Sequence, residues 1–135
     1  MAGEISGPQR VTPALLKKME EMVPLAPAHN PVYIALMRTL LQRYPELTQI
    51  ACFETAFHAT VPLYRAVYGV PKAWRAWGVR RFGFHGASHG YIAHCVQERH
   101  PECRRVVSVH LGGSSSLCAI RDGKSVFTTM GATPQ

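Results

Sequence analysis

The sequence predicts an α/β fold, in which helices dominate the first part of the chain and antiparallel strands the last. Two observations support this class. Apolar residues recur at helical spacing in segments bounded by proline or capping residues, and β-branched runs separated by turn residues fill the C-terminal part. The chain has 135 residues, of which 47% are hydrophobic and 17% are charged, so it can bury a core and is not globally disordered.

Two helices are expected in the first third of the chain. Thr12 can cap the first helix and Pro13 suits its first position, and an apolar stripe then continues to Pro24. The same signal recurs at residues 30–31, and a second stripe ends before residue 45. The residues expected on the buried faces are Leu15, Leu16, Met19, Met22 and Val23 in the first helix, and Ile34, Met37, Leu40, Leu41 and Tyr44 in the second.

A short strand and a third helix are expected next. Residues 50–53 are continuously apolar, which is typical of a strand buried on both faces, and Glu54 stands at its carboxyl end. Residues 57–84 are interrupted by proline and glycine and show no clear period. Ser88 is then expected to cap a helix that ends at residue 100. Its inward-facing residues should be Tyr91, Ile92, Cys95 and Val96.

The C-terminal part has the pattern of a hairpin sheet. Strands are expected at residues 106–109, 117–120 and 125–128, and Asp122-Gly123 is a strong two-residue turn signal. The three strands should form an antiparallel meander. The change from helix to hairpins suggests a boundary between two structural units within residues 101–104.

Charge and cysteine content narrow the class of protein. The formal net charge of +7 suits phosphate-bearing ligands, nucleic acid or an acidic membrane surface. Aromatic and basic residues alternate over residues 64–81, as in some nucleic-acid-binding proteins, but no such motif accompanies them, which favours ordinary packing. No apolar run is long enough to span a membrane, and residues 1–10 do not form a signal peptide. The four cysteines form no Cys-x-x-Cys pair, so we expect free thiols in the reducing cytoplasm.

Glycine and small hydroxyl residues fill the segment at residues 110–116. Glycines allow backbone N–H groups to converge on an anion and serine hydroxyls add donors, so the segment is a candidate phosphate cradle. An ordinary serine-rich hairpin loop has the same local sequence, and both interpretations stay open. Residues 123–125 do not complete a Walker motif, because Cys118 occupies its first glycine position.

Three other side chains are candidates for chemistry. His85 lies between two glycines just before a helix, where it could donate to a phosphoryl oxygen, and His29 stands at another helix entrance. Glu54 is either a solvated carboxylate or an acid at the edge of a sheet, where α/β proteins place their ligands. No metal site is expected, because the helical spacing of the nearest zinc-like cluster points its ligands apart. That cluster is His94, Cys95, His100 and Cys103.

Five blocks of the sequence, taken in order, resemble the acetate kinase family, which includes propionate and butyrate kinases. The resemblance begins near Val11 and extends to Pro134. The blocks are Ala26-Pro27-Ala28-His29-Asn30-Pro31, Phe53-Glu54-Thr55-Ala56-Phe57-His58, Arg81-Phe82-Gly83-Phe84-His85-Gly86-Ala87-Ser88-His89, His110-Leu111-Gly112, and residues 123–134.

The resemblance implies a fold and an activity. The fold is part of the ribonuclease-H-like architecture of the sugar kinase, actin and heat-shock ATPase superfamily. Residues 1–103 would end the first domain, and residues 104–135 would form the opening hairpins of the second. The activity is transfer of a phosphoryl group from ATP to acetate or another short-chain carboxylate, with Mg²⁺, in a cytoplasmic homodimer that binds neither nucleic acid nor membrane.

The resemblance also implies roles for single residues. His85 matches the histidine that stabilises the transferring phosphoryl group, and Glu54 stands where the family has an active-site aspartate. His29 matches a histidine near the substrate site. The ATP-phosphate loop corresponds to His110, Leu111, Gly112, Gly113 and Ser114. These residues would bring two anions together, which is the central problem when the substrate carboxylate is already ionised.

The sequence also departs from the family pattern. Gly113 replaces an asparagine of the phosphate loop, Phe127 replaces an aspartate, and Glu54 is one methylene longer than the expected acid. Several family segments, among them two arginines, the adenosine-binding glycines and a magnesium-binding glutamate, have no counterpart in this chain. Two alternatives therefore stay open: an inactive fragment that acts by association, and a basic nucleic-acid-binding module.

Overall fold

The structure is a computed structural model that describes residue 5 and residues 7–131. It mixes helices and antiparallel strands, in agreement with the predicted class. The chain divides into two compact units, Met1–Phe53 and Glu54–Gln135, and each is described by itself. The structural boundary thus precedes the third long helix, whereas the division at residues 103 and 104 concerns the domains of longer family members and stays a prediction.

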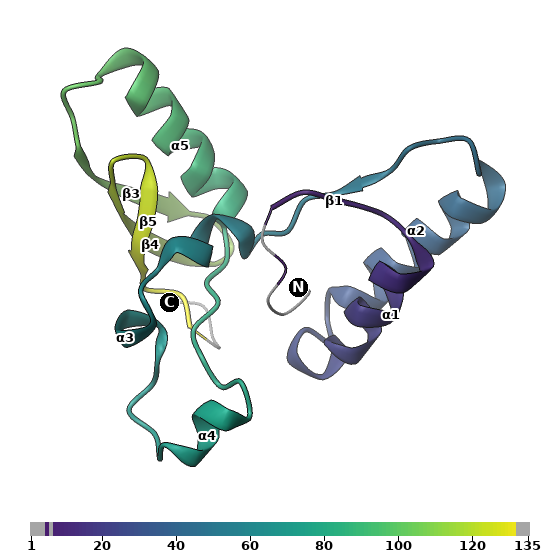
Figure 1. Ribbon diagram of the computed structural model, residues 1–135. Helices are drawn as coiled ribbons and strands as arrows, with labels where there is room; N and C mark the ends of the chain where they lie inside the picture. Colours follow the sequence, from purple (N-terminus) through teal and green to yellow (C-terminus); the bar gives the residue numbers. More distant parts are fainter. Residues whose placement is uncertain (1–4, 6, 132–135) are drawn as a thin grey trace. The chain divides into compact units, whose positions relative to one another are not determined.

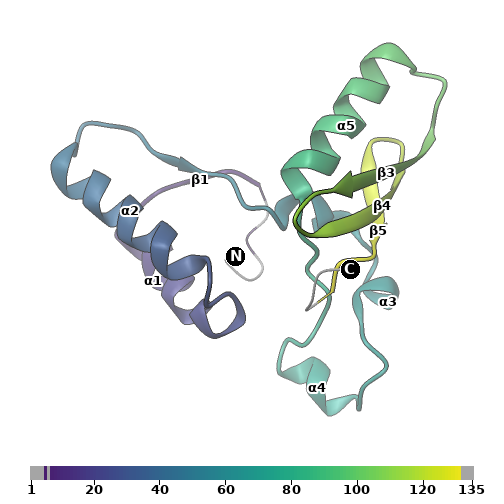
Figure 2. The same cartoon turned by 180° about the vertical axis from the view of Figure 1, so that it is seen from behind.

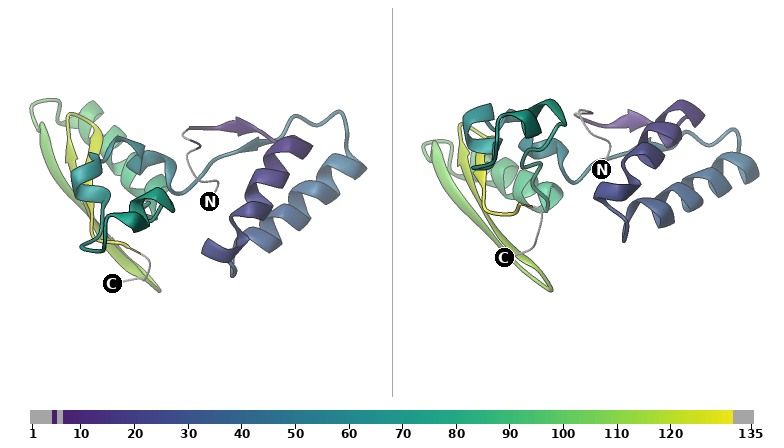
Figure 3. Two further views of the ribbon diagram at one scale, coloured as in Figure 1. Left: turned by 60° about the horizontal axis from the view of Figure 1, so that its bottom comes forward. Right: turned by 90° about the horizontal axis from the view of Figure 1, so that it is seen from below.

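The first unit is a pair of helices with a small strand ribbon (Figure 3). Its elements are β1 (Gln9–Arg10), α1 (Pro13–Glu21), the 3₁₀ turn η1 (Val23–Leu25), α2 (Asn30–Arg43) and β2 (Ile50–Ala51). The Thr12 hydroxyl accepts a hydrogen bond from the Leu15 amide at 3.2 Å, which confirms the predicted cap. The Asn30 side chain donates to the Met19 carbonyl at 3.0 Å and so links the two helices.

Two expectations for this unit are wrong. The strand at residues 50–53 has only two residues and pairs with β1 alone, so Ile50 is 54% exposed instead of buried on both faces. A two-stranded ribbon leaves one face of such a strand open. The stripe of the second helix is buried fully only at Ile34, and Tyr44, just beyond the helix, is half exposed.

The second unit packs a long helix on a three-stranded sheet (Figures 1 and 2). The sheet is the predicted antiparallel meander, ordered β3-β4-β5. Asp122 and Gly123 have φ values of 50° and 74° and form the predicted turn. The elements are η2 (Ala56–Thr60), α3 (Leu63–Ala66), α4 (Ala73–Ala76), α5 (Gly86–Arg99), β3 (Arg105–Leu111), β4 (Ser115–Arg121) and β5 (Lys124–Thr128).

The long helix α5 differs from its prediction at its start and on its buried face. It begins at Gly86, so Ser88 lies in its first turn rather than at the cap. Tyr91 is 66% exposed and Ile92 is also exposed, whereas His89 and Ala93 face the sheet. The apolar period misplaced this face because α5 meets a polar layer of the sheet.

The interior of the second unit is unusually polar. Its apolar residues are a cluster of Ala93, Cys118 and Ile120, with Phe57 and Val106 packed against it, and the buried Val61, Ala66 and Met130. Apart from Gly86, the remaining buried positions of α5, η2 and the sheet carry hydroxyl or imidazole groups: His58, His89, Ser108, Ser116, Ser125 and Thr128. Buried polar groups are tolerated when they are hydrogen-bonded, and these side chains bond mainly to one another.

Among the described residues, no helix has the length and apolar character needed to cross a membrane.

Candidate active site

His85 occupies a strained position at the start of α5. Its backbone is left-handed, with φ 58° and ψ 25°, which few residues other than glycine adopt. Such a conformation costs about 1–3 kcal/mol and persists only where the surroundings determine it. The backbone therefore turns sharply at His85 and places the His85 ring at the N-terminus of α5.

Two serine hydroxyls of β4 and its entry hold the His85 ring. The Nδ1 atom lies 2.8 Å from the Ser116 hydroxyl, and the Nε2 atom lies 3.1 Å from the Ser114 hydroxyl. One face of the ring stacks on His110 of β3, with the centroids 3.9 Å apart and an interplanar angle of 22°. His110 in turn bonds to the Ser88 hydroxyl at 3.0 Å. The half-exposed His85 ring is thus fixed at both nitrogens and on one face.

Glu54 is tied to this site through the main chain. The Gly86 amide donates to the Glu54 carbonyl at 3.0 Å. A Cβ atom at Gly86 would lie 2.1 Å from that same oxygen, so only glycine permits the approach. The Glu54 side chain is exposed, and its carboxylate is close enough to oppose part of the lowering of the pKa values of His58 and His85 by burial. The structure therefore brings Glu54 and His85 to one site.

The predicted phosphate loop is the β3–β4 hairpin connection. Leu111, Gly112 and Gly113 are exposed, and the Gly112 amide donates to the Ser114 carbonyl at 3.2 Å. Through Ser114 and His110 the loop contacts His85 directly. The exposed glycines of the loop and the ring of His85 therefore lie beside each other in the second unit.

Burial favours the neutral form of three imidazoles of this site, His58, His85 and His89. Desolvation is the main cause that lowers the pKa of His58, His85 and His89, and for His89 the pKa falls to about 4. The neighbouring His110 lowers the pKa of His85 further, while the Glu54 carboxylate opposes it. At pH 7 the His85 ring is consequently a neutral donor and acceptor of hydrogen bonds rather than a cation.

The other sequence candidates lie elsewhere. His29 belongs to the first compact unit, where it is exposed at the start of α2 and stacks on Tyr33 at 6.4 Å. In the described part of the chain no three His, Cys, Asp or Glu side chains are grouped to hold a metal ion. His94 instead pairs with Glu98 at 3.4 Å, and all four cysteines are free thiols.

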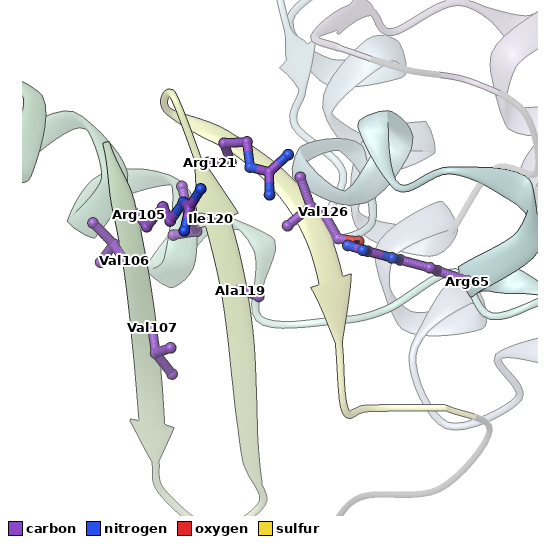
Figure 4. A pocket seen from close by; sticks show the side chains of 8 residues that line it. All are labelled: Arg65, Arg105, Val106, Val107, Ala119, Ile120, Arg121 and Val126. Atoms are coloured by element: carbon purple, nitrogen blue, oxygen red, sulfur yellow. Dashed lines mark hydrogen bonds between the residues drawn. The ribbon is translucent and has the colours of Figure 1, made fainter. Parts of the chain in front are cut away.

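A shallow hollow on the sheet is separate from these residues (Figure 4). It has a volume of about 280 Å³ and contains none of the predicted site residues. Arg65, Arg105 and Arg121 surround an apolar floor of Val106, Val107, Ala119, Ile120 and Val126. Its position does not coincide with the chemistry that gathers around His85.

Sequence reasoning singled out no chemical role for three residues that complete the site: His58, Ser108 and Ser125. It had assigned Ser88 to the helix cap and Ser116 only to the candidate phosphate cradle at residues 110–116. Their signal was the period of two along the strands, which places Ser108 with His110 and Ser114 with Ser116 on one face. The spacing of four between His85, which caps α5, and His89 within it likewise turns both rings toward that face.

The sequence and the fold of this chain are similar to those of known proteins. The chain matches the Acetokinase family over residues 3–135. The chain belongs to this family. It is 47% identical over 130 residues to an acetate kinase of Synechococcus sp., covering 94% of this chain and 32% of that protein. It is 46% identical over 132 residues to a propionate kinase of Citrobacter rodentium, covering 93% and 32%.

Solved structures of acetokinase relatives have the same fold. The crystal structure of a propionate kinase from Francisella tularensis matches with a TM-score of 0.92 at 37% identity, over 99% of this chain and 36% of that one. Acetate kinase of Porphyromonas gingivalis matches with a TM-score of 0.87. The expected partial α/β fold is thereby confirmed. The chain spans about a third of the length of these relatives.

Proposed function

We propose that this chain forms part of an acetate kinase site, which transfers a phosphoryl group from ATP to acetate or a related short-chain carboxylate. The observation that carries the proposal is the fixed ring of His85, which contacts both the phosphate loop and a buried serine. Strained, over-determined residues of this kind cluster at active sites. Family membership and the order of the sequence blocks support the same assignment. We extend the proposal to a cytoplasmic homodimer that binds neither nucleic acid nor membrane.

The residues have distinct parts in this proposal. His85 is the donor to the transferring phosphoryl group, and the loop of His110, Leu111, Gly112, Gly113 and Ser114 holds the phosphates of ATP. Glu54 is the acid of the site, and His29 contacts the carboxylate substrate. Because the substrate is ionised at neutral pH, no general base is required, and preorganised donors supply the rate enhancement.

Magnesium is the cofactor that the family implies. The described residues fit it poorly on their own, because the site contains one carboxylate, Glu54, and no cluster of three ligating side chains. We therefore assign no step to the metal in this chain.

The basic and aromatic segment at residues 64–81 does not favour the nucleic-acid alternative. Arg81 donates to the Thr128 and Thr129 carbonyls at 2.9 and 2.7 Å and so holds the end of the sheet.

The test is a chimera in which this chain replaces the matching third of a full-length acetate kinase. Acetyl phosphate is trapped with hydroxylamine in the presence of ATP, magnesium and acetate. His85→Ala should lower kcat by about 10²–10³ with little change in KM, because the donor acts mainly in the transition state. His94→Ala, exposed on the same helix, is the matched control and should leave kcat unchanged. A His85→Ala chimera with kcat within a few-fold of the parent would refute the assignment.

A second candidate function is association without catalysis. The outward face of the sheet exposes four apolar side chains, Val107, Val109, Leu111 and Leu117, and Leu111 is 78% exposed. Exposed apolar patches mark interaction sites in soluble proteins. In this case the isolated chain should produce no acyl hydroxamate, and Val109→Lys should reduce its self-association in sedimentation experiments. A monomeric wild-type chain would remove this candidate.

A further inference from the structure

One buried hydroxyl lies between two imidazoles. The Ser116 Oγ atom is 2.8 Å from His85 Nδ1 and 2.9 Å from His89 Nε2. On its other side, His89 Nδ1 is 2.9 Å from the Ser108 hydroxyl. Ser116 and His89 are fully buried and Ser108 nearly so. The groups therefore form a continuous row from the core to the phosphate loop: Ser108, His89, Ser116, His85 and Ser114.

A hydroxyl carries a single proton, which restricts how this row can be arranged. If Ser116 donates to His85, it must accept from His89, and both neutral rings then carry their proton on Nε2. If Ser116 donates to His89, both rings carry their proton on Nδ1. If both rings donate, the Ser116 oxygen accepts both protons and its own proton has no acceptor; if neither ring donates, one ring nitrogen faces the oxygen without a proton between them.

The inner end of the row distinguishes the two arrangements. In the first, the Ser108 hydroxyl donates to His89 Nδ1 and every buried donor has an acceptor. In the second, His89 donates to Ser108, and the Ser108 proton has no other acceptor among the described residues. A buried donor left without a partner costs about 1–3 kcal/mol. The first arrangement is consequently the stable one when both rings are neutral.

We infer that Ser116 is a positioning residue that couples the tautomers of His85 and His89, and that the coupled pair places the His85 proton on Nε2, the nitrogen beside the phosphate loop. The coupling stands on geometry alone. Only the role of the His85 Nε2–H group, as a donor to a phosphoryl oxygen, rests on the proposed function.

The coupling has a consequence when His85 takes up a proton. A charged His85 donates from Nδ1, so Ser116 must accept, and the Ser116 proton then has an acceptor only if His89 Nε2 is unprotonated. We expect the neutral His89 to move its proton from Nε2 to Nδ1, because the hydroxyl left without an acceptor is then that of Ser108, which is 4% exposed, and not that of Ser116, which is 0% exposed. The titratable groups that face His85 and His89 are His58 from η2, His110 from β3 and Glu54. They affect the pH at which the tautomer of His89 changes, and not the direction of that change.

The experiment is NMR of the 135-residue chain labelled with ¹⁵N at histidine, because ring nitrogen shifts identify each tautomer. At pH 8 both His85 and His89 should be protonated on Nε2. As the pH falls through the titration of His85, the neutral His89 should switch to the Nδ1 tautomer. A His89 that keeps its proton on Nε2 through this titration, or that carries it on Nδ1 at pH 8, would overturn the inference.

Two variants separate coupling from mere packing. Ser116→Ala should abolish the response of His89 to the titration of His85, and Ser116→Thr, which keeps the hydroxyl, should restore it. Ser125→Ala is the matched control: this serine is equally buried in the sheet but bonds His58 at 2.9 Å, so the switch of His89 should persist. A switch that survives in Ser116→Ala contradicts the coupling, and no activity measurement enters either result.

Discussion

Gly86→Ala should destabilise the second unit by about 2–3 kcal/mol. A Cβ atom at this position would lie 2.1 Å from the Glu54 carbonyl oxygen and 3.2 Å from Phe57 Cβ. Main-chain atoms cannot yield by changing rotamer, so the start of α5 must move away and its hydrogen bond to Glu54 is lost. Overpacking costs about 1–3 kcal/mol and the hydrogen bond about 1 kcal/mol, offset in part by the higher helix propensity of alanine.

Gly90→Ala, one turn further along α5, is the matched control. Its Cβ atom would meet the Phe57 ring at 3.2 Å, and a side chain can tilt by the few tenths of an ångström required. Alanine also gains up to about 1 kcal/mol in helix propensity, so this variant should remain within about 1 kcal/mol of the parent. Urea unfolding monitored by the fluorescence of Trp74 and Trp77 reports on the second unit, which contains both. Equal midpoints for Gly86→Ala and the parent would refute the argument from main-chain contact.

Two further outcomes follow from burial in the second unit. The folded pKa of His89, about 4, lies below its ordinary value of 6.5, so its contribution to stability is complete above pH 6.5 and is lost as the pH falls toward 4. The free energy of unfolding should fall over this window by at most about 3 kcal/mol, and His89→Gln, but not the exposed His94→Gln, should flatten the curve in urea titrations at several pH values. A thiol reagent such as DTNB should modify the exposed Cys52 and Cys103 rapidly and Cys118 only on unfolding, because Cys118 is buried and burial raises the pKa of its thiol. Rapid reaction of Cys118 in the folded chain would contradict the buried position.

Local signals predicted those parts of the fold that local interactions determine. The cap at Thr12 and the turn at Asp122-Gly123 each depend on neighbours in sequence, and both are present. The strand β1 was missed because its two residues are extended only through pairing with β2, some forty positions away. The start of α5 was misplaced because the contact of Gly86 with Glu54 is also distant in sequence.

Part of the membership of the candidate site was predictable, and the contacts among its residues were not. The resemblance to a family singled out His85 and the loop from His110 to Ser114, and the structure brings these residues together. Ser116 was included only as one hydroxyl of the candidate phosphate cradle, because a serine within a strand does not show which side chains it will meet. Its importance arises from two rings that reach it from α5, a relation that only the fold creates.

The polar interior beneath His85 also determines how this region responds to charge. Apolar cores have few dipoles that can reorient, so an anion arriving at their edge is solvated poorly. Here the hydroxyls of Ser108, Ser114 and Ser116 can rotate about a single bond while the backbone stays in place. The interior thus combines the rigidity of a packed core with hydroxyl dipoles that can reorient. These dipoles can stabilise a negative charge that arrives at its edge without admitting water.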